Sequence, residues 1–426
     1  MADLALFVLL LILSKGIFSI VKRPESAYEF PVFMSMTFAI FIVPQCFSII
    51  NFPGQAYGQP VQDVLVMTML CAAVCVFGYP KRGFQSLNRF CSTPMDERRL
   101  FHGGIVFLVV SAYCTYLISG MSIEESGGSA WTGIITIYHF FTVLMFPSFA
   151  ILLRHAIKFR SNLSLLLALA ASIPIIQQVV FSGRRETAVF FLLTIGVVLW
   201  CEKRFPPPRI AVIFMAFAAM LAIPATGKYR SAASNNDWSE VSKIDFIENF
   251  IDYFSRESIL ELRNASMVIA GTRYTGEYGL GVAYWDELVW RFVPAQIVGR
   301  DIKNFLMIAK DEGFENILGN SGYAIPGGST ITAMGDAFMQ FGFFGCLVFL
   351  FPAKLFRTLW DASQSPNGVF SELMYIGIMT SAMRAVTHQT VDFLPGLVYQ
   401  WFFMGGLWFY AKKSSSQISE TGIIED

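Results

Sequence analysis

The chain has 426 residues, of which 54% are hydrophobic and 15% are charged. This apolar content exceeds what a single soluble core can hold, and it indicates a membrane protein that crosses the bilayer several times. The 31 Lys and Arg residues balance the 31 Asp and Glu residues, so no overall charge favours nucleic acid as a partner.

Runs of about 20 apolar residues predict transmembrane helices. About eleven such runs are present, at 2–20, 29–50, 61–78, 103–119, 133–153, 162–181, 187–201, 209–225, 333–353, 368–387 and 393–411. The first run lacks a basic segment and a small-residue cleavage site, so we expect a retained helix and not a signal peptide. The sequence predicts an all-α polytopic membrane protein with one large outer loop that contains amphipathic helices. Its expected parts are spans one to eight (1–225), the outer loop (226–328), spans nine to eleven (329–411) and a tail (412–426).

The segments between the runs differ in charge. Lys and Arg gather in the segments with Lys22/Arg23, Lys81 to Arg99, Arg154/Lys158/Arg160, Lys203/Arg204/Arg209, Lys354/Arg357 and Lys412/Lys413. The positive-inside rule places these segments in the cytoplasm. Segments 51–60 and 120–132 carry no Lys or Arg, as expected of outer loops. The N-terminus is then predicted outside and the C-terminus in the cytoplasm.

Several cations break this charge rule because they fall at the outer face. They are Arg184 and Arg185 in the turn Ser182-Gly183-Arg184-Arg185-Glu186, Lys228 and Arg230 after the run at 209–225, and Arg384. Guanidinium groups grip phosphate oxygens through paired hydrogen bonds, so the set predicts a binding site for a lipid-linked diphosphate. The alternative for Arg184 and Arg185 is that they reach the headgroups of bulk lipid from a helix end.

Four side chains near the same face are candidates for a general base. They are Glu186, Asp336, His388 and Asp392, and the sequence does not rank them. Glu186 is also placed to pair with a neighbouring arginine. His388 also suits a helix end, where its ring bonds a backbone carbonyl.

The outer loop contains two informative stretches. Between Asn235 and Ile269, isoleucines at helical spacing predict an amphipathic helix that lies on the membrane or over the bundle. Trp285 and Trp290 flank Asp286 and Glu287, a pattern that suits stacking on sugar rings and equally suits an interfacial aromatic belt. Tyr278, Trp285, Trp290 and Arg291 form the predicted glycan-binding set. The seven cysteines show no zinc spacing, so no metal and no cofactor are expected.

The order of these motifs resembles the Wzy-type polymerases of oligosaccharide repeat units, which are bacterial inner-membrane glycosyltransferases related to the O-antigen ligases. The matching pieces are the Ser-Gly-Arg-Arg-Glu turn, the outer loop with Tyr278-Gly279 and Phe292-Val293-Pro294, and the Gly-Ser-Thr run at 328–330 that leads to Gly335-Asp336 and Phe341-Gly342. Asp336 departs from the pattern, since many relatives have glutamate there. The resemblance implies polymerisation of undecaprenyl-diphosphate-linked units at the periplasmic face. It also implies a flippase and a chain-length regulator as partners, besides membrane lipids.

Three other functions fit parts of the pattern. A ligase that moves a finished glycan to another acceptor, such as a lipid A core, shares the arginine and histidine features. A flippase or transporter should show internal repeats and charges near the membrane midplane, neither of which is seen in the sequence. A scaffold for assembly leaves the arginine cluster at lipid depth unexplained.

Overall fold

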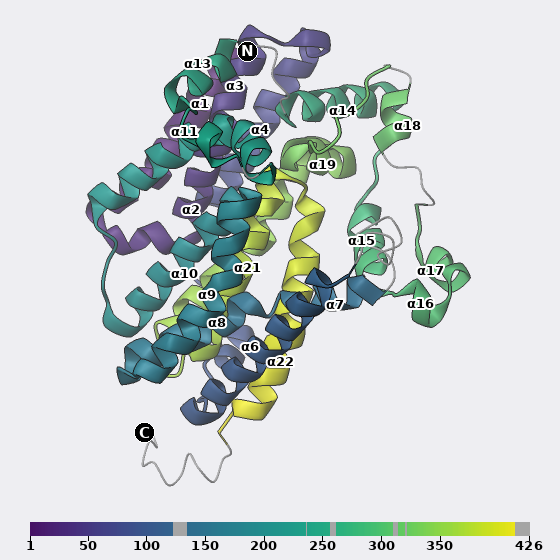
Figure 1. Cartoon of the computed structure of the whole chain (residues 1–426). Helices are drawn as coiled ribbons and strands as arrows, with labels where there is room; N and C mark the ends of the chain where they lie inside the picture. The colour runs from purple at the N-terminus through teal and green to yellow at the C-terminus, as the bar shows by residue number, and fades with distance from the viewer. Residues whose placement is uncertain (122–133, 236, 256–260, 310–313, 320–321, 414–426) are drawn as a thin grey trace. The chain divides into compact units, whose positions relative to one another are not determined.

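The structure is a computed structural model that describes all residues except 122–133, 236, 256–260, 310–313, 320–321 and 414–426 (Figure 1). The described residues form helices and loops, with one isolated bridge between Met95 and Lys412. The predicted all-α class is therefore confirmed. The expected outer segment at 120–132 and the tail at 412–426 fall largely outside the described residues.

Seven helical segments are long and apolar enough to cross a membrane. They are Ala2–Lys22, Phe30–Asn51, Gln59–Phe77, Glu97–Ser119, Ile135–Phe159, Asn162–Ser182 and Thr332–Ser363. An eighth candidate span results if two neighbouring helical parts count as one. These parts are Arg209–Ala222 and Pro224–Ala233, and the bend between them is 70°. Helices also form at the other expected positions, namely α10 (Arg185–Lys203), α21 (Val369–Thr387) and α22 (Phe393–Ala411). The multi-pass character is thus supported, whereas the count of eleven stays a prediction.

The chain divides into two compact units, and each contains segments distant in sequence. Unit 1 comprises Met1–Arg82, Pro207–Arg357 and Ile378–Val398. Unit 2 comprises Gly83–Pro206, Thr358–Gly377 and Tyr399–Asp426. The two units are therefore interleaved along the sequence, and each is described by itself.

The helices of unit 1 are built around the first three spans. The N-terminal helices α1 (Ala2–Lys22), α2 (Phe30–Thr37) and α4 (Gln59–Phe77) pack against one another. Their contacts bury large apolar side chains, including Leu9, Phe30, Met34 and Leu65. Between membrane helices such close packing is favoured mainly by van der Waals contact, because lipid tails are as apolar as these side chains. The shorter elements here are η1 (Pro24–Tyr28), η2 (Phe38–Ile42), α3 (Val43–Asn51) and η3 (Gly54–Ala56).

Helices joined by turns and irregular stretches make up the described residues of the expected outer loop. Its elements are the end of α11 (Arg209–Ser234), then α12 (Trp238–Val241), α13 (Phe246–Ser255), α14 (Glu261–Thr275), α15 (Val282–Phe292), α16 (Ala295–Val298), α17 (Arg300–Leu306) and α18 (Phe314–Gly319). Helix α13 leaves Phe246, Ile247 and Ile251 exposed, which agrees with the predicted amphipathic helix.

Helix α14 does not lie on a surface, so the alternative of a helix on the membrane is wrong for the second half of residues 235–269. Leu262, Ala265 and Val268 are fully buried, because α14 packs against α4, α18 and α19 (Thr332–Phe341) (Figure 1). Arg273 at its end forms an ion pair with Asp63 of α4. The polar residues that make α14 look like a surface helix instead bond to neighbouring segments.

Helix α19 ends inside the seventh candidate span because the helical conformation is interrupted at Gly342. This residue has φ 59° and ψ −145°, a conformation that favours glycine. The chain then continues as η4 (Gly342–Phe349), which packs back on α19. A Cβ atom at Gly345 would overlap the carbonyl oxygen of Ala337. The backbone N–H groups of Gly279 and Leu280 donate to the last carbonyls of α19, at Met339 and Gln340, over 3.0 Å each.

Unit 2 contains the helices α5 (Gln85–Cys91), α6 (Glu97–Ser119), α7 (Ile134–Thr142), α8 (Met145–Phe159), α9 (Asn162–Ser182) and α10. Helix α8 is central because it contacts α6, α9 and α10. Its apolar face joins α9 in a buried cluster of Met145, Phe149, Leu152, Ala168, Ala171 and Ile175. The C-terminal halves of α20 (Leu350–Ser363) and α22, together with the first half of α21, complete the unit.

Candidate functional site

A polar pocket of about 270 Å³ lies in unit 1 at the end of α21. It is lined by Arg291, Ile325, Ser329, Thr330, Ile331, Arg384, His388, Gln389 and Asp392. Four of these residues, Arg291, Arg384, His388 and Asp392, are among those singled out from the sequence. The structure thus brings together two predicted phosphate or glycan contacts and two predicted base candidates.

The local geometry of α21 explains how Arg384 and His388 reach the same pocket. They are four residues apart, so they share one face of the helix. The backbone N–H of His388 donates to the carbonyl oxygen of Arg384 over 2.8 Å, which completes the last turn. The His388 ring is held through Nδ1, which lies 2.9 Å from Thr387 Oγ1. An imidazole and a guanidinium therefore face one small space.

Asp392 is paired within the pocket. Its carboxylate accepts a hydrogen bond from Arg291 Nη2 at 2.7 Å, and only 12% of its side chain is exposed. Arg291 also pairs with Glu287 one helical turn away on α15. Because its charge is already engaged, Asp392 is placed better to hold Arg291 than to remove a proton from a substrate. His388 is the stronger candidate base.

The wall formed by residues 329 and 330 is fixed by α14. Asn264, which is almost fully buried, donates from Nδ2 to Ser329 Oγ at 2.9 Å and to the carbonyl oxygen of Thr330 at 2.8 Å. Thr330 Oγ1 in turn donates to the carbonyl oxygen of Thr387 at 3.0 Å. Sequence reasoning missed Asn264, and its only signal was a polar amide within the first turn of a helix.

Asp336 does not line the pocket. It is 2% exposed, and Oδ2 of its carboxylate accepts hydrogen bonds from Thr390 Oγ1 and from the backbone N–H of Val391 at 3.2 Å. Both donors belong to η5 (Thr390–Asp392), the turn after α21. The prediction of Asp336 as a base in the site is therefore not supported by its position. Its contacts fix the turn that carries Asp392.

Tyr284 extends this hydrogen-bonded chain. Its hydroxyl lies 2.6 Å from Thr390 Oγ1, and burial, followed by the nearby Asp336 carboxylate, raises the pKa of the Tyr284 phenol. The phenol therefore keeps its proton. Since the single hydroxyl proton of Thr390 goes to Asp336, Tyr284 donates to Thr390.

Replacing Asp336 by Leu and replacing Thr390 by Val should each destabilise the protein, because either change removes the hydrogen bond between the two side chains. We expect each single change to lower the free energy of unfolding by about 1.5–3 kcal/mol, the range for a bond to a charged group. The double variant should lose little more than the worse single variant, because the bond is lost only once. Thermal unfolding in one detergent measures all four proteins. Fully additive losses would show that the two residues act separately.

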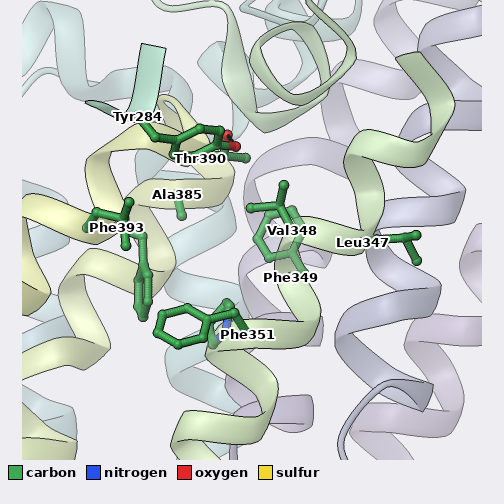
Figure 2. A pocket seen from close by; sticks show the side chains of 10 residues that line it. Tyr284, Leu347, Val348, Phe349, Phe351, Ala385, Thr390 and Phe393 are labelled. Carbon is green, nitrogen blue, oxygen red and sulfur yellow. Dashed lines mark hydrogen bonds between the residues drawn. The ribbon is translucent and has the colours of Figure 1, made fainter. Parts of the chain in front are cut away.

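An apolar pocket, also of about 270 Å³, adjoins the same turn (Figure 2). It is lined by Tyr284, Leu347, Val348, Phe349, Phe351, Pro352, Ala385, Thr390, Phe393 and Leu394. Figure 2 shows Tyr284 and Thr390 close together at one end, and the rings of Phe351 and Phe393 meet edge to face at 6.1 Å. Thr390 borders the apolar pocket while Gln389 and Asp392 border the polar one. The η5 turn therefore separates a charged space from an apolar space.

The predicted glycan contacts on α15 have other partners. Trp285 Nε1 donates to the carbonyl oxygen of Leu306 at 2.8 Å, and Lys303 Nζ lies 4.3 Å above the centre of the Trp290 ring. Partial burial lowers the pKa of Lys303. The Tyr278 ring lies 6.2 Å from that of Phe338. None of these aromatic residues is among the residues lining the polar pocket, and two of them join α15 to the segment that follows it.

The other predicted residues lie elsewhere. Lys228 and Arg230 are exposed on α11, and they are not among the pocket residues. Arg184, Arg185 and Glu186 belong to unit 2, at the junction of α9 and α10. Gly183 at this junction has φ 58° and ends α9, and the Arg184 side chain is exposed. Sequence reasoning grouped these cations in one site; the structure describes Arg184 and Arg185 within unit 2, and Lys228, Arg230 and Arg384 within unit 1.

No protein-family model, no curated protein and no solved structure matches this chain. A space that holds Arg384 and His388, and in which Arg291 already offsets the charge of Asp392, suits an anionic group. An apolar space on the other side of the same turn suits a hydrocarbon chain.

Proposed function

We propose that the protein is a membrane glycosyltransferase that polymerises oligosaccharide repeat units carried on undecaprenyl diphosphate. One observation carries the proposal, namely that a polar pocket with Arg291, Arg384 and His388 adjoins an apolar pocket across η5. A lipid diphosphate has both matching parts, an anionic head and an isoprenoid tail. The resemblance of the motifs to Wzy-type polymerases supports the choice of this lipid over a bulk phospholipid.

The proposed reaction transfers the growing glycan to the terminal sugar of another lipid-linked unit. A hydroxyl oxygen of the acceptor forms a bond to the anomeric carbon of the donor, while the bond from that carbon to the diphosphate oxygen breaks. Arg384 stabilises the negative charge that develops on the diphosphate. His388 takes the proton of the attacking hydroxyl. We expect no need for a nucleotide sugar, because the donor is already activated as a diphosphate ester.

We place the protein in a bacterial inner membrane, with the polar pocket at the periplasmic face, the N-terminus in the periplasm and the C-terminus in the cytoplasm. A flippase that delivers the lipid-linked unit and a chain-length regulator are the partners that this function requires. The charge distribution of the sequence and its motif order support this placement.

The test is to reconstitute the purified protein with undecaprenyl-diphosphate-linked repeat units from its own host and to separate the products on a gel. We expect a ladder of longer lipid-linked glycans without added nucleotide sugar. A single unchanged band contradicts the polymerase proposal. A product that forms only after a lipid A core is added assigns the protein as a ligase, and movement of the unit across the vesicle without chemistry assigns it as a transporter.

A further inference from the structure

A buried group of charges lies in unit 2. Arg154 of α8 is 4% exposed and contacts glutamates from three other helices. They are Glu97 of α6, Glu202 of α10 and Glu372 of α21. Charges buried among membrane helices are costly and mark functional sites by default. We call Arg154, Lys158, Glu97, Glu202 and Glu372 the Arg154 cluster.

The Arg154 guanidinium does not bind its three glutamate partners in the same way. Glu97 is held by both terminal nitrogens, with Nη1 to Oε2 at 2.7 Å and Nη2 to Oε1 at 3.1 Å. Lys158 Nζ also bonds Glu97, at 2.6 Å. Glu202 and Glu372 instead meet the same atom, because Arg154 Nε is 2.7 Å from Glu202 Oε1 and 3.3 Å from Glu372 Oε2. A single N–H cannot point squarely at two carboxylates.

The charges of the cluster do not balance when all groups are ionised, since three carboxylates face two cations. The nearby groups do not make up the difference. Arg204 donates to Gln364 and lies over the Trp200 ring, and His155 Nδ1 lies 2.8 Å from Ser164 Oγ. Cys201 is a further titratable neighbour and precedes Glu202 in the chain. Its thiol cannot carry a positive charge.

Only one of the two carboxylate oxygens of Glu372 accepts a hydrogen bond among the described residues. The residue is 3% exposed, and its Oε1 atom has no hydrogen-bond partner within the part of the chain that the structure describes. An ionised oxygen buried in this way loses its hydration and gains nothing in return. No group of three or more His, Cys, Asp or Glu within the described ranges is placed to hold a metal ion. The ligand that fits a single oxygen beside a second carboxylate is a proton.

We infer that Glu202 and Glu372 form a proton-binding pair that holds one proton at neutral pH and thereby keeps α10 and α21 packed on Arg154. Two carboxylates that meet the same guanidinium nitrogen do not both ionise readily, and the proton belongs to the pair. With this proton bound, the three carboxyl groups carry two negative charges and match Arg154 and Lys158. Loss of the proton leaves two repelling carboxylates in a buried place.

The sign of the pH effect follows from proton counting. The folded state holds a proton that the unfolded chain has lost at neutral pH, so stability falls as the pH rises. This behaviour is opposite to that of an ordinary buried carboxylate paired with an arginine, whose contribution to stability is lost at low pH.

Infrared spectroscopy of the full-length protein at about pH 7 tests the pair, since it separates the C=O stretch of a protonated carboxyl from the bands of carboxylates. We expect Glu372→Gln and Glu202→Gln each to remove one protonated-carboxyl band, because either change leaves two carboxylates for two cations. The control, Asp63→Asn, should keep the band. A band that survives Glu372→Gln or Glu202→Gln overturns the pair.

Thermal unfolding in detergent between about pH 6 and about pH 9 provides a second readout that does not depend on assigning a band. The unfolding temperature of the unaltered protein should fall as the pH rises, and that of Glu372→Gln should fall much less. Asp63→Asn should unfold at a lower temperature but keep the slope of the unaltered protein. If the unfolding temperatures of Glu372→Gln and of the unaltered protein fall equally steeply with pH, the inference is contradicted, even when Glu372→Gln folds well.

Discussion

The Arg384→Gln variant should lose about 100- to 1000-fold in the rate of glycan transfer, the range for removing one fixed donor to a developing negative charge. Arg384 lines the polar pocket together with His388, and glutamine keeps much of its length while losing its charge. The amide cannot neutralise a departing diphosphate. The measurement is the initial rate of ladder formation with reconstituted protein and lipid-linked repeat units.

Two control variants separate a local effect from a general loss of positive charge. Arg230→Gln removes the same charge from the exposed part of α11 and should keep nearly normal activity, although the sequence placed Arg230 in the same set. Arg384→Lys should fall between the extremes, because an ammonium keeps the charge but not the paired hydrogen bonds. Equal losses in Arg230→Gln and Arg384→Gln would contradict the assignment of the pocket.

Arg154→Met should lower the free energy of unfolding by about 3–5 kcal/mol, the usual cost of removing one partner from a buried ion pair. The substitution leaves Glu97, Glu202 and Glu372 close together without the cation that joins them. A loss of this size is a large part of the stability of most domains. The yield of monodisperse protein and its unfolding temperature in detergent measure the effect.

The matched control is Arg98→Met, which makes the same chemical change in unit 2 at an exposed side chain. We expect it to change stability by less than about 0.5 kcal/mol. A partial rescue completes the test, since adding Glu202→Gln and Glu372→Gln to Arg154→Met removes the uncompensated charges. If Arg154→Met is as stable as Arg98→Met, the cluster does not hold these helices together.

Local patterns predicted much of the fold. Long apolar runs specify membrane helices because the bilayer demands a set length of apolar residues. Arg384 and His388 were predicted on one side of the membrane, and their spacing of four residues is enough to put them on one helix face. Their convergence with Arg291 depends on α15 meeting η5, which no local pattern encodes.

The Arg154 cluster shows what sequence reading cannot recover. Arg154 was interpreted as one of the positive charges that mark a cytoplasmic loop, and this interpretation assumes a side chain in water. Its partners Glu97 and Glu372 are 57 and 218 residues away in the chain. Asp336 was misjudged for a related reason, because its donors Thr390 and Val391 are 54 and 55 residues away. Charged residues reveal their depth only when distant helices are in place.

The interleaving of the two units constrains how the protein is made. Helix α14 leaves the ribosome before α19, the helix that covers its buried face, and η5 follows later still. Unit 1 therefore cannot close until residues 378–398 have been synthesised and inserted. Until then the apolar face of α14 needs lipid or a chaperone to cover it. A chain that stops before α21 should be recognised as unfinished by cellular quality control, although most of its membrane segments are already in the bilayer.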